Sequence, residues 1–185
     1  MRHLTHLKRI LRRDNMRMQA MESLRSLGLE SGWIGAGFVR DAVWDDRHRH
    51  GTCPITGDVD VLFWAESHSD TAIEIHLEQR LRHLSCAFDW SVRNQARMHI
   101  RNGDTAYDDI ADAMRYWPET ATAVAVRLNA HADIEVLAPF GLDDLFGLIL
   151  RPTPRFQGEK YGQFQQRIAE KQWLTRYPHL QLLPR

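Results

Sequence analysis

The sequence predicts a protein of the α/β (α+β) class, in which a small mixed β-sheet is flanked by helices. Apolar residues recur at intervals of three and four in residues 3–27 and 72–84, a pattern typical of amphipathic helices. They alternate with other residues in 58–63 and 120–137, which is typical of strands. Because the two patterns are interspersed along the chain, we expect helices and strands to share one core.

The amino-terminal part is predicted to be helical. Leu7, Leu11 and Leu24 belong to an apolar stripe with charged residues between its members. Such a stripe covers one side of a helix and packs on a core. We therefore expect one or two helices over residues 3–27, ending near Gly28.

The rest of the chain is predicted to alternate between strands and helices. Polar residues with Pro54 and Gly57 mark a loop, and Pro152 and Pro154 mark a linker. The expected elements are a short strand at 33–34, a helix at 38–44, a strand at 58–63, a helix at 72–84, a strand at 87–92, a short helix at 108–116, a hairpin of strands at 120–128 and 133–137, and a terminal helix at 158–175.

Two aspartates, Asp58 and Asp60, lie in an otherwise apolar strand. Because strand side chains alternate, both leave the same face, and Val59 and Val61 leave the other. Neighbouring carboxylates repel each other, which raises the pKa of one of them unless a cation lies between them. Hard oxygen ligands suit Mg²⁺, and aspartate is unfavourable in strands. We therefore expect metal binding rather than a solvated edge strand.

A glycine turn precedes the aspartates. Gly35-Ala36-Gly37, followed by apolar residues and Arg40, is typical of a helix entrance whose free amide groups bind a phosphate. A dinucleotide-binding fold is the alternative, since it has Gly-x-Gly and a later acid. It is disfavoured because Arg40 stands where that fold has its third glycine. Phosphate together with a divalent metal indicates phosphoryl or nucleotidyl transfer.

The loop before the aspartate strand contains further metal-binding side chains. His48, His50 and Cys53 could hold Zn²⁺, but a structural zinc site needs four ligands and the sequence offers no obvious fourth. We expect a flexible polar loop here.

Length and composition favour one domain in the cytoplasm. The 185 residues are expected to form amino-terminal helices at 1–28, a body that carries the site at 29–150, and a linker with a helix at 151–185. No apolar run approaches a membrane span and no signal core follows Met1, so we expect no membrane partner and free thiols at both cysteines. The ends are basic and the middle is acidic, which suggests that the ends fold back on the body.

Several segments resemble the DNA polymerase β-like nucleotidyltransferase superfamily. Gly35 to Asp41 with Asp58-x-Asp60 is similar to the head of tRNA nucleotidyltransferases, and the whole chain resembles a family of small bacterial nucleotidyltransferase-like proteins. The segments that carry this likeness are residues 35–40, 58–61, 90–99, 117–120 and 138–146. The superfamily commonly has glycine where Ala36 stands, and we expect Gly35 to compensate by one place.

The resemblance implies further site residues. The superfamily needs a third carboxylate on a neighbouring strand, for which Asp89 fits best, with Asp133 and Glu135 in reserve. It also implies that the polar segment after this strand binds the nucleotide, through Arg93, Asn94, Gln95 and Arg97. The cofactor would be Mg²⁺ or Mn²⁺.

The function that these features predict is transfer of a nucleoside monophosphate from a nucleoside triphosphate to an acceptor hydroxyl. The acceptor could be RNA, a protein or a small molecule. One alternative is a non-catalytic nucleotide or nucleic-acid binder on the same fold. Another is a phosphohydrolase that uses the same aspartates with water as acceptor.

Overall fold

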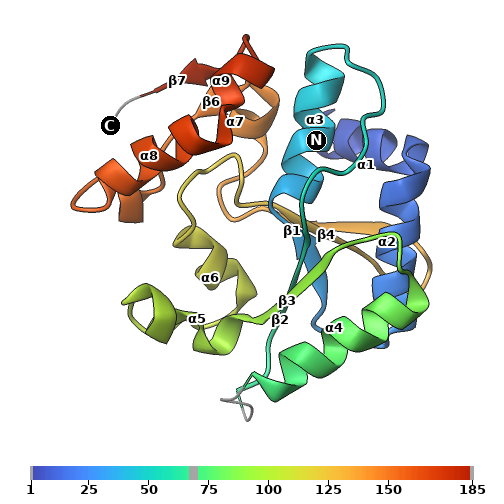
Figure 1. Ribbon diagram of the computed structural model, residues 1–185. Helices are drawn as coiled ribbons and strands as arrows, with labels where there is room; N and C mark the ends of the chain where they lie inside the picture. Colours follow the sequence, from blue (N-terminus) through green and yellow to red (C-terminus); the bar gives the residue numbers. More distant parts are fainter. Residues whose placement is uncertain (1, 67–70, 184–185) are drawn as a thin grey trace.

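The computed structural model describes residues 2–66 and 71–183, and its helices surround a five-stranded sheet (Figure 1). The strands are β1 (Trp33–Gly35), β2 (Val59–Phe63), β3 (Trp90–Asn94), β4 (Ala125–Leu128), β5 (Ile134–Leu137), β6 (Ile149–Leu150) and β7 (Gln181–Leu182). The helices are α1 (Arg2–Arg13), α2 (Asn15–Ser26), α3 (Gly37–Arg47), α4 (Ala72–Leu84), α5 (Gln95–Asn102), α6 (Ile110–Arg115), α7 (Asp143–Phe146), α8 (Tyr161–Lys171) and α9 (Trp173–Arg176), with a 3₁₀ helix η1 (Pro154–Phe156). The predicted mixed α/β architecture is confirmed.

The sheet has the strand order β3-β2-β1-β4-β5. Strands β2 and β3 are parallel, and α4 forms the crossover that a parallel pair requires. The other neighbours are antiparallel, including the predicted hairpin of β4 and β5. In this register Asp60 lies opposite Ser91, and Ile34 lies between Val61 and Val126.

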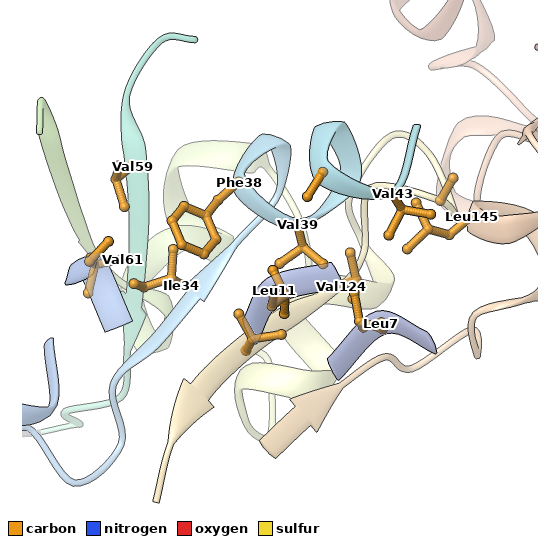
Figure 2. Packing of buried hydrophobic residues seen from close by; sticks show 14 of the residues in the cluster. Leu7, Leu11, Ile34, Phe38, Val39, Val43, Val59, Val61, Val124 and Leu145 are labelled. Carbon is orange, nitrogen blue, oxygen red and sulfur yellow. The ribbon is translucent and has the colours of Figure 1, made fainter. Parts of the chain in front are cut away.

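The main core lies between one face of the sheet and helices α1 to α4. Figure 2 shows α1 contributing Leu7 and Leu11, and Phe38 of α3 lying beside Ile34 and Val61 of the sheet. All five side chains are buried. The amino-terminal helices therefore belong to the same core as the strands.

The opposite face of the sheet is covered by fewer helices. A smaller cluster joins Leu62 of β2 and Ala125 of β4 to Ile110 and Met114 of α6. Helices α5 and α6 lie beside one end of the sheet and the carboxyl-terminal helices α8 and α9 lie above, as Figure 1 shows. This face holds the cavity described below.

The basic ends of the chain form ion pairs with the acidic middle, as their charge predicted. Arg12 lies 3.0 Å from Asp133, and Arg155 lies 2.6 Å from Asp104. Arg167 of α8 contacts the buried carboxylate of Glu119 at 2.9 Å. Both cysteines are free, and none of the described helices is long and apolar enough to cross a membrane.

The predicted terminal helix needs correction, and a segment for which no element was predicted is helical. The terminal helix expected over residues 158–175 is divided into α8 and α9, because Gln172 adopts a left-handed conformation with φ of 51°. The polar residues after β3 form a helix, α5, whose first turn is capped by the side chain of Asn94.

Replacing Leu11 with alanine tests whether α1 is part of the core. Leu11 is fully buried, so Leu11→Ala should lower the free energy of unfolding by about 2–5 kcal/mol. Leu4 of the same helix is 41% exposed, and Leu4→Ala should change it by less than about 1 kcal/mol. Urea unfolding of both variants measures the difference. Equal effects would contradict a docked α1.

Candidate active site

Strand β2 brings the two aspartates to one cavity. Val59, Val61 and Phe63 are buried in the main core, so the alternating side chains of Asp58 and Asp60 face the other way. Both line a cavity of about 440 Å³. Its polar lining consists of Asp58, Asp60, Ser91, Arg93, Gln95, Arg101, Asn102, Tyr107, Thr122 and Arg167.

The environment of Asp60 favours a bound cation. Burial, and next the charge of Asp58, raise the pKa of Asp60 to about 6. Arg167, Arg93 and Arg40 act in the opposite direction, but they do not cancel the rise. The carboxylates of Asp58 and Asp60 lie in one cavity and their negative charge is not fully compensated, so they fit a divalent cation such as Mg²⁺.

The small-residue turn between β1 and α3 also reaches the cavity, through Ala36. Ala36 itself has a positive φ of 55°, so Gly35 does not take over the role of the expected turn glycine. Gly35 instead lies in close packing: a Cβ there would lie 3.1 Å from Trp117 and 3.2 Å from Leu62, so these side chains would have to shift to admit one. Gly37 begins α3, where the first amide groups lack intrahelical partners.

Arg40 lies behind the cavity wall. Its guanidinium donates to Asp41 from Nε at 2.9 Å and contacts the same carboxylate from Nη2 at 2.7 Å. It also stacks on Trp173, 4.4 Å from the ring centre, and contacts the cavity residue Thr122 at 3.4 Å. Arg40 thus acts on the cavity through its charge, while its side chain is fixed by other residues.

The polar segment after β3 divides into two groups. Arg93 and Gln95 line the cavity, and Arg93 is held by Glu78 of α4 at 2.9 Å. Asn94 is fully buried and bonds the backbone of Ala65.

Arg97 belongs with Asn94. It makes a two-pronged ion pair with the buried Glu74, at 2.9 and 2.6 Å. The structure thus places Asn94 and Arg97 outside the cavity lining, where they hold α5 and its neighbours together.

The predicted third carboxylate, Asp89, lies outside the cavity lining that contains the first two, although its backbone carbonyl accepts a hydrogen bond from the N–H of Val59 at 2.7 Å. Asp89 precedes β3, and its side chain is 77% exposed, with Arg82 of α4 at 4.0 Å. The residue of β3 that lies opposite Asp60 is Ser91, which lines the cavity. Among the described residues, the cavity lining contains two carboxylates, Asp58 and Asp60.

The reserve candidates lie elsewhere as well. Asp133 pairs with Arg12, and Glu135 pairs with Arg127 at 2.7 Å. Neither acid lines the cavity that holds Asp58 and Asp60.

The sequence analysis missed Arg167. This side chain comes from α8 and lines the cavity opposite β2, held by Glu119, whose carboxylate is fully buried. One signal was present: Arg167 follows Phe164 by three residues and therefore lies near the apolar side of its helix. An arginine in that place suggests a buried acidic partner.

Asp58 and Asp60 of β2 and Ala36 at the entrance to α3 thus line one cavity on a mixed sheet. The chain belongs to the nucleotidyltransferase family, whose model matches residues 22–182. A comparison with curated proteins finds no match.

Solved structures share the fold. A protein whose NMR structure reveals a CCA-adding enzyme head domain is 29% identical, with a TM-score of 0.83 over 98% of this chain and 96% of that one. A tRNA-processing enzyme in an apo form is 16% identical, with a TM-score of 0.56 over 89% of this chain and 44% of that enzyme.

The Thermotoga maritima CCA-adding enzyme complexed with tRNA shows the same relation. It is 15% identical, with a TM-score of 0.56 over 86% of this chain and 38% of that enzyme. At these identities the last two likenesses show the fold alone, and the chain spans less than half of either enzyme.

The raised pKa of Asp60 makes stability depend on pH. Unfolding returns this pKa from about 6 to its ordinary value of 3.8, so the folded state binds more protons between these values. The wild-type protein should therefore lose stability relative to Asp60→Asn as pH rises through this window.

In the presence of a chelator, the free energy of unfolding of Asp60→Asn relative to wild type should rise by about 1–3 kcal/mol between pH 3.5 and pH 7, as a pKa shift of this size implies. Urea unfolding of both proteins across this range measures it. An advantage that stays constant with pH would contradict the raised pKa.

Proposed function

We propose that this protein transfers a nucleoside monophosphate from a nucleoside triphosphate to an acceptor hydroxyl, with Mg²⁺ or Mn²⁺ as cofactor. The observation that carries the proposal is the pair Asp58 and Asp60 in one cavity with Arg167 and the start of α3. Family membership and the likeness to a CCA-adding enzyme head domain support the same class of reaction.

The reaction would break one bond and form one. The acceptor oxygen would attack the α-phosphorus, the bond to pyrophosphate would break, and the hydroxyl proton would leave to solvent or a base. Asp58 and Asp60 would hold the divalent cation, which supplies positive charge to the triphosphate and lowers the pKa of the acceptor hydroxyl.

The basic side chains would bind the phosphates. Arg167, Arg93 and Arg101 line the cavity, and an arginine fork suits phosphate oxygens. Arg40 would add positive charge from behind the wall, close to the turn at Gly37, where a Cβ would lie 3.3 Å from its Nη2. Charge that develops on the leaving pyrophosphate would thus meet groups already fixed in place.

The acceptor is open within this proposal. A related CCA-adding enzyme was solved with tRNA, which makes an RNA end one acceptor to test. This chain aligns with only 38% of that enzyme, so a protein hydroxyl and a small molecule belong in the same panel.

Removing either carboxylate should abolish the reaction. Asp58→Asn and Asp60→Asn should each lower Mg²⁺-dependent pyrophosphate release by roughly 100-fold or more, the scale of losing one charged stabilising group. Asp89→Asn is the matched control and should stay within about threefold, because Asp89 lies outside the cavity lining. A large loss in Asp89→Asn would instead make that residue a metal ligand.

Arg167 should contribute to triphosphate binding. Arg167→Met should raise KM for the triphosphate roughly 10- to 100-fold, because a hydrogen bond to a charged group contributes about 1.5–3 kcal/mol. Arg167→Lys, which keeps the charge but lacks the fork, should be intermediate. Lys171→Met alters an exposed residue of the same helix and should leave KM unchanged. Equal KM values in all variants would exclude Arg167 from the site.

A second candidate function is nucleotide binding without turnover. It is favoured by the cavity lining, which has two carboxylates rather than the three expected of an active superfamily member. Binding of a triphosphate without release of pyrophosphate from any acceptor mixture would support it. Release without a labelled product would instead indicate a phosphohydrolase.

A further inference from the structure

A second group of metal-binding side chains lies away from the aspartate cavity. Asp45 of α3 meets His50 and Cys53 of the following loop, and one ligand atom from each lies within 4.8 Å of the other two. The sequence pattern indicated the histidines and the cysteine but missed Asp45, which lies in the last turn of α3 and therefore close to the loop.

Asp45 has a carboxylate oxygen in need of a partner. Its side chain is 2% exposed, and its Oδ1 accepts a hydrogen bond from the hydroxyl of Tyr177 at 3.0 Å and lies 3.5 Å from Arg176. Its Oδ2 is buried with no hydrogen-bond partner. A buried acceptor without a donor is costly, and a bound cation would satisfy it.

The two histidines of the loop are in different states. His48 uses both ring nitrogens: Nδ1 faces the carbonyl of Trp44 at 2.8 Å, and Nε2 accepts from the backbone N–H of His179 at 3.1 Å. His50 faces the cluster, with Nδ1 3.4 Å from Oδ1 of Asp45. That separation matches the roughly 3.3–3.6 Å expected between neighbouring ligands of a tetrahedral zinc ion.

We propose that Asp45, His50 and Cys53 form a zinc site, with water as the fourth ligand. A thiolate and an imidazole select Zn²⁺ over Mg²⁺, which prefers oxygen ligands alone. Binding breaks the S–H bond of Cys53, forms the Zn–S bond and releases one proton to solvent. Burial and the charge of Asp45 raise the pKa of the Cys53 thiol, and Arg176 and Arg17 only partly oppose this, so the metal ion itself would stabilise the thiolate.

The site would connect the loop to the helix before it. His50 and Cys53 lie in the segment between α3 and β2, a few residues before Asp58. A metal ion bonded to both and to Asp45 would fix this segment against α3. This zinc site is independent of the proposed transferase function.

Metal binding to the full-length protein tests the proposal. After removal of metal with a chelator, the protein should bind one Co²⁺ with a sulfur-to-metal charge-transfer band, and Zn²⁺ should displace it. Cys53→Ser should lose the band and bind Zn²⁺ at least about 100-fold more weakly, since even outer partners of a ligand contribute 10- to 100-fold. Cys86→Ser, which alters the other free cysteine, should keep the charge-transfer band and the affinity for Zn²⁺.

A second measurement needs no variant. A thiol-alkylating reagent should modify Cys53 and Cys86 in the metal-free protein, and Zn²⁺ should protect Cys53 alone, as mass spectrometry of the peptides would show. Absence of a charge-transfer band, or equal alkylation of Cys53 with and without Zn²⁺, would overturn the proposal.

A further variant tests the carboxylate ligand. Asp45→Asn should weaken Zn²⁺ binding at least tenfold, and unchanged affinity would remove Asp45 from the site.

Discussion

The alternation of side chains along β2 is the constraint on which the site depends. Val59 and Val61 are buried on one face, and this fixes the strand in the core. Asp60 must then point to the opposite face, where the covering helices leave a cavity. A slip of one residue would bury the carboxylates and expose the valines, so the apolar face determines the position of the acids.

Three arginines oppose the negative charge at Asp60, and each is held by an acid of its own. Arg167 pairs with Glu119, Arg93 with Glu78 and Arg40 with Asp41. Each carboxylate fixes its guanidinium and takes up part of its charge. The cavity therefore has positioned donors without full neutralisation of the aspartates, and the pKa of Asp60 stays raised. Such fixed donors need little rearrangement when a charged ligand binds.

Local patterns predicted the parts of the molecule that depend on neighbours in sequence. The amphipathic helices, the hairpin and the shared face of Asp58 and Asp60 follow from periods of 3.6 and 2 residues. The neighbour of Asp60 on the next strand depends instead on the register between β2 and β3, which sets Ser91 opposite Asp60. No local pattern encodes that register.

Partners far apart in sequence account for the other differences. The resemblance predicted that Arg97 binds a nucleotide, and in the structure its guanidinium forms an ion pair with Glu74, 23 residues earlier. Arg167 was missed because Glu119, its partner, is 48 residues away. Pairings of this kind become visible only when the chain is folded.

The dispersed origin of the cavity has a consequence for biosynthesis. Its wall starts at Ala36, before α3, and is completed by Arg167 of α8. On the ribosome, where chains emerge from the amino terminus, the acidic pair is made long before that arginine. A nascent chain can thus bury its valines early, but it gains a finished cavity only after translation has passed α8.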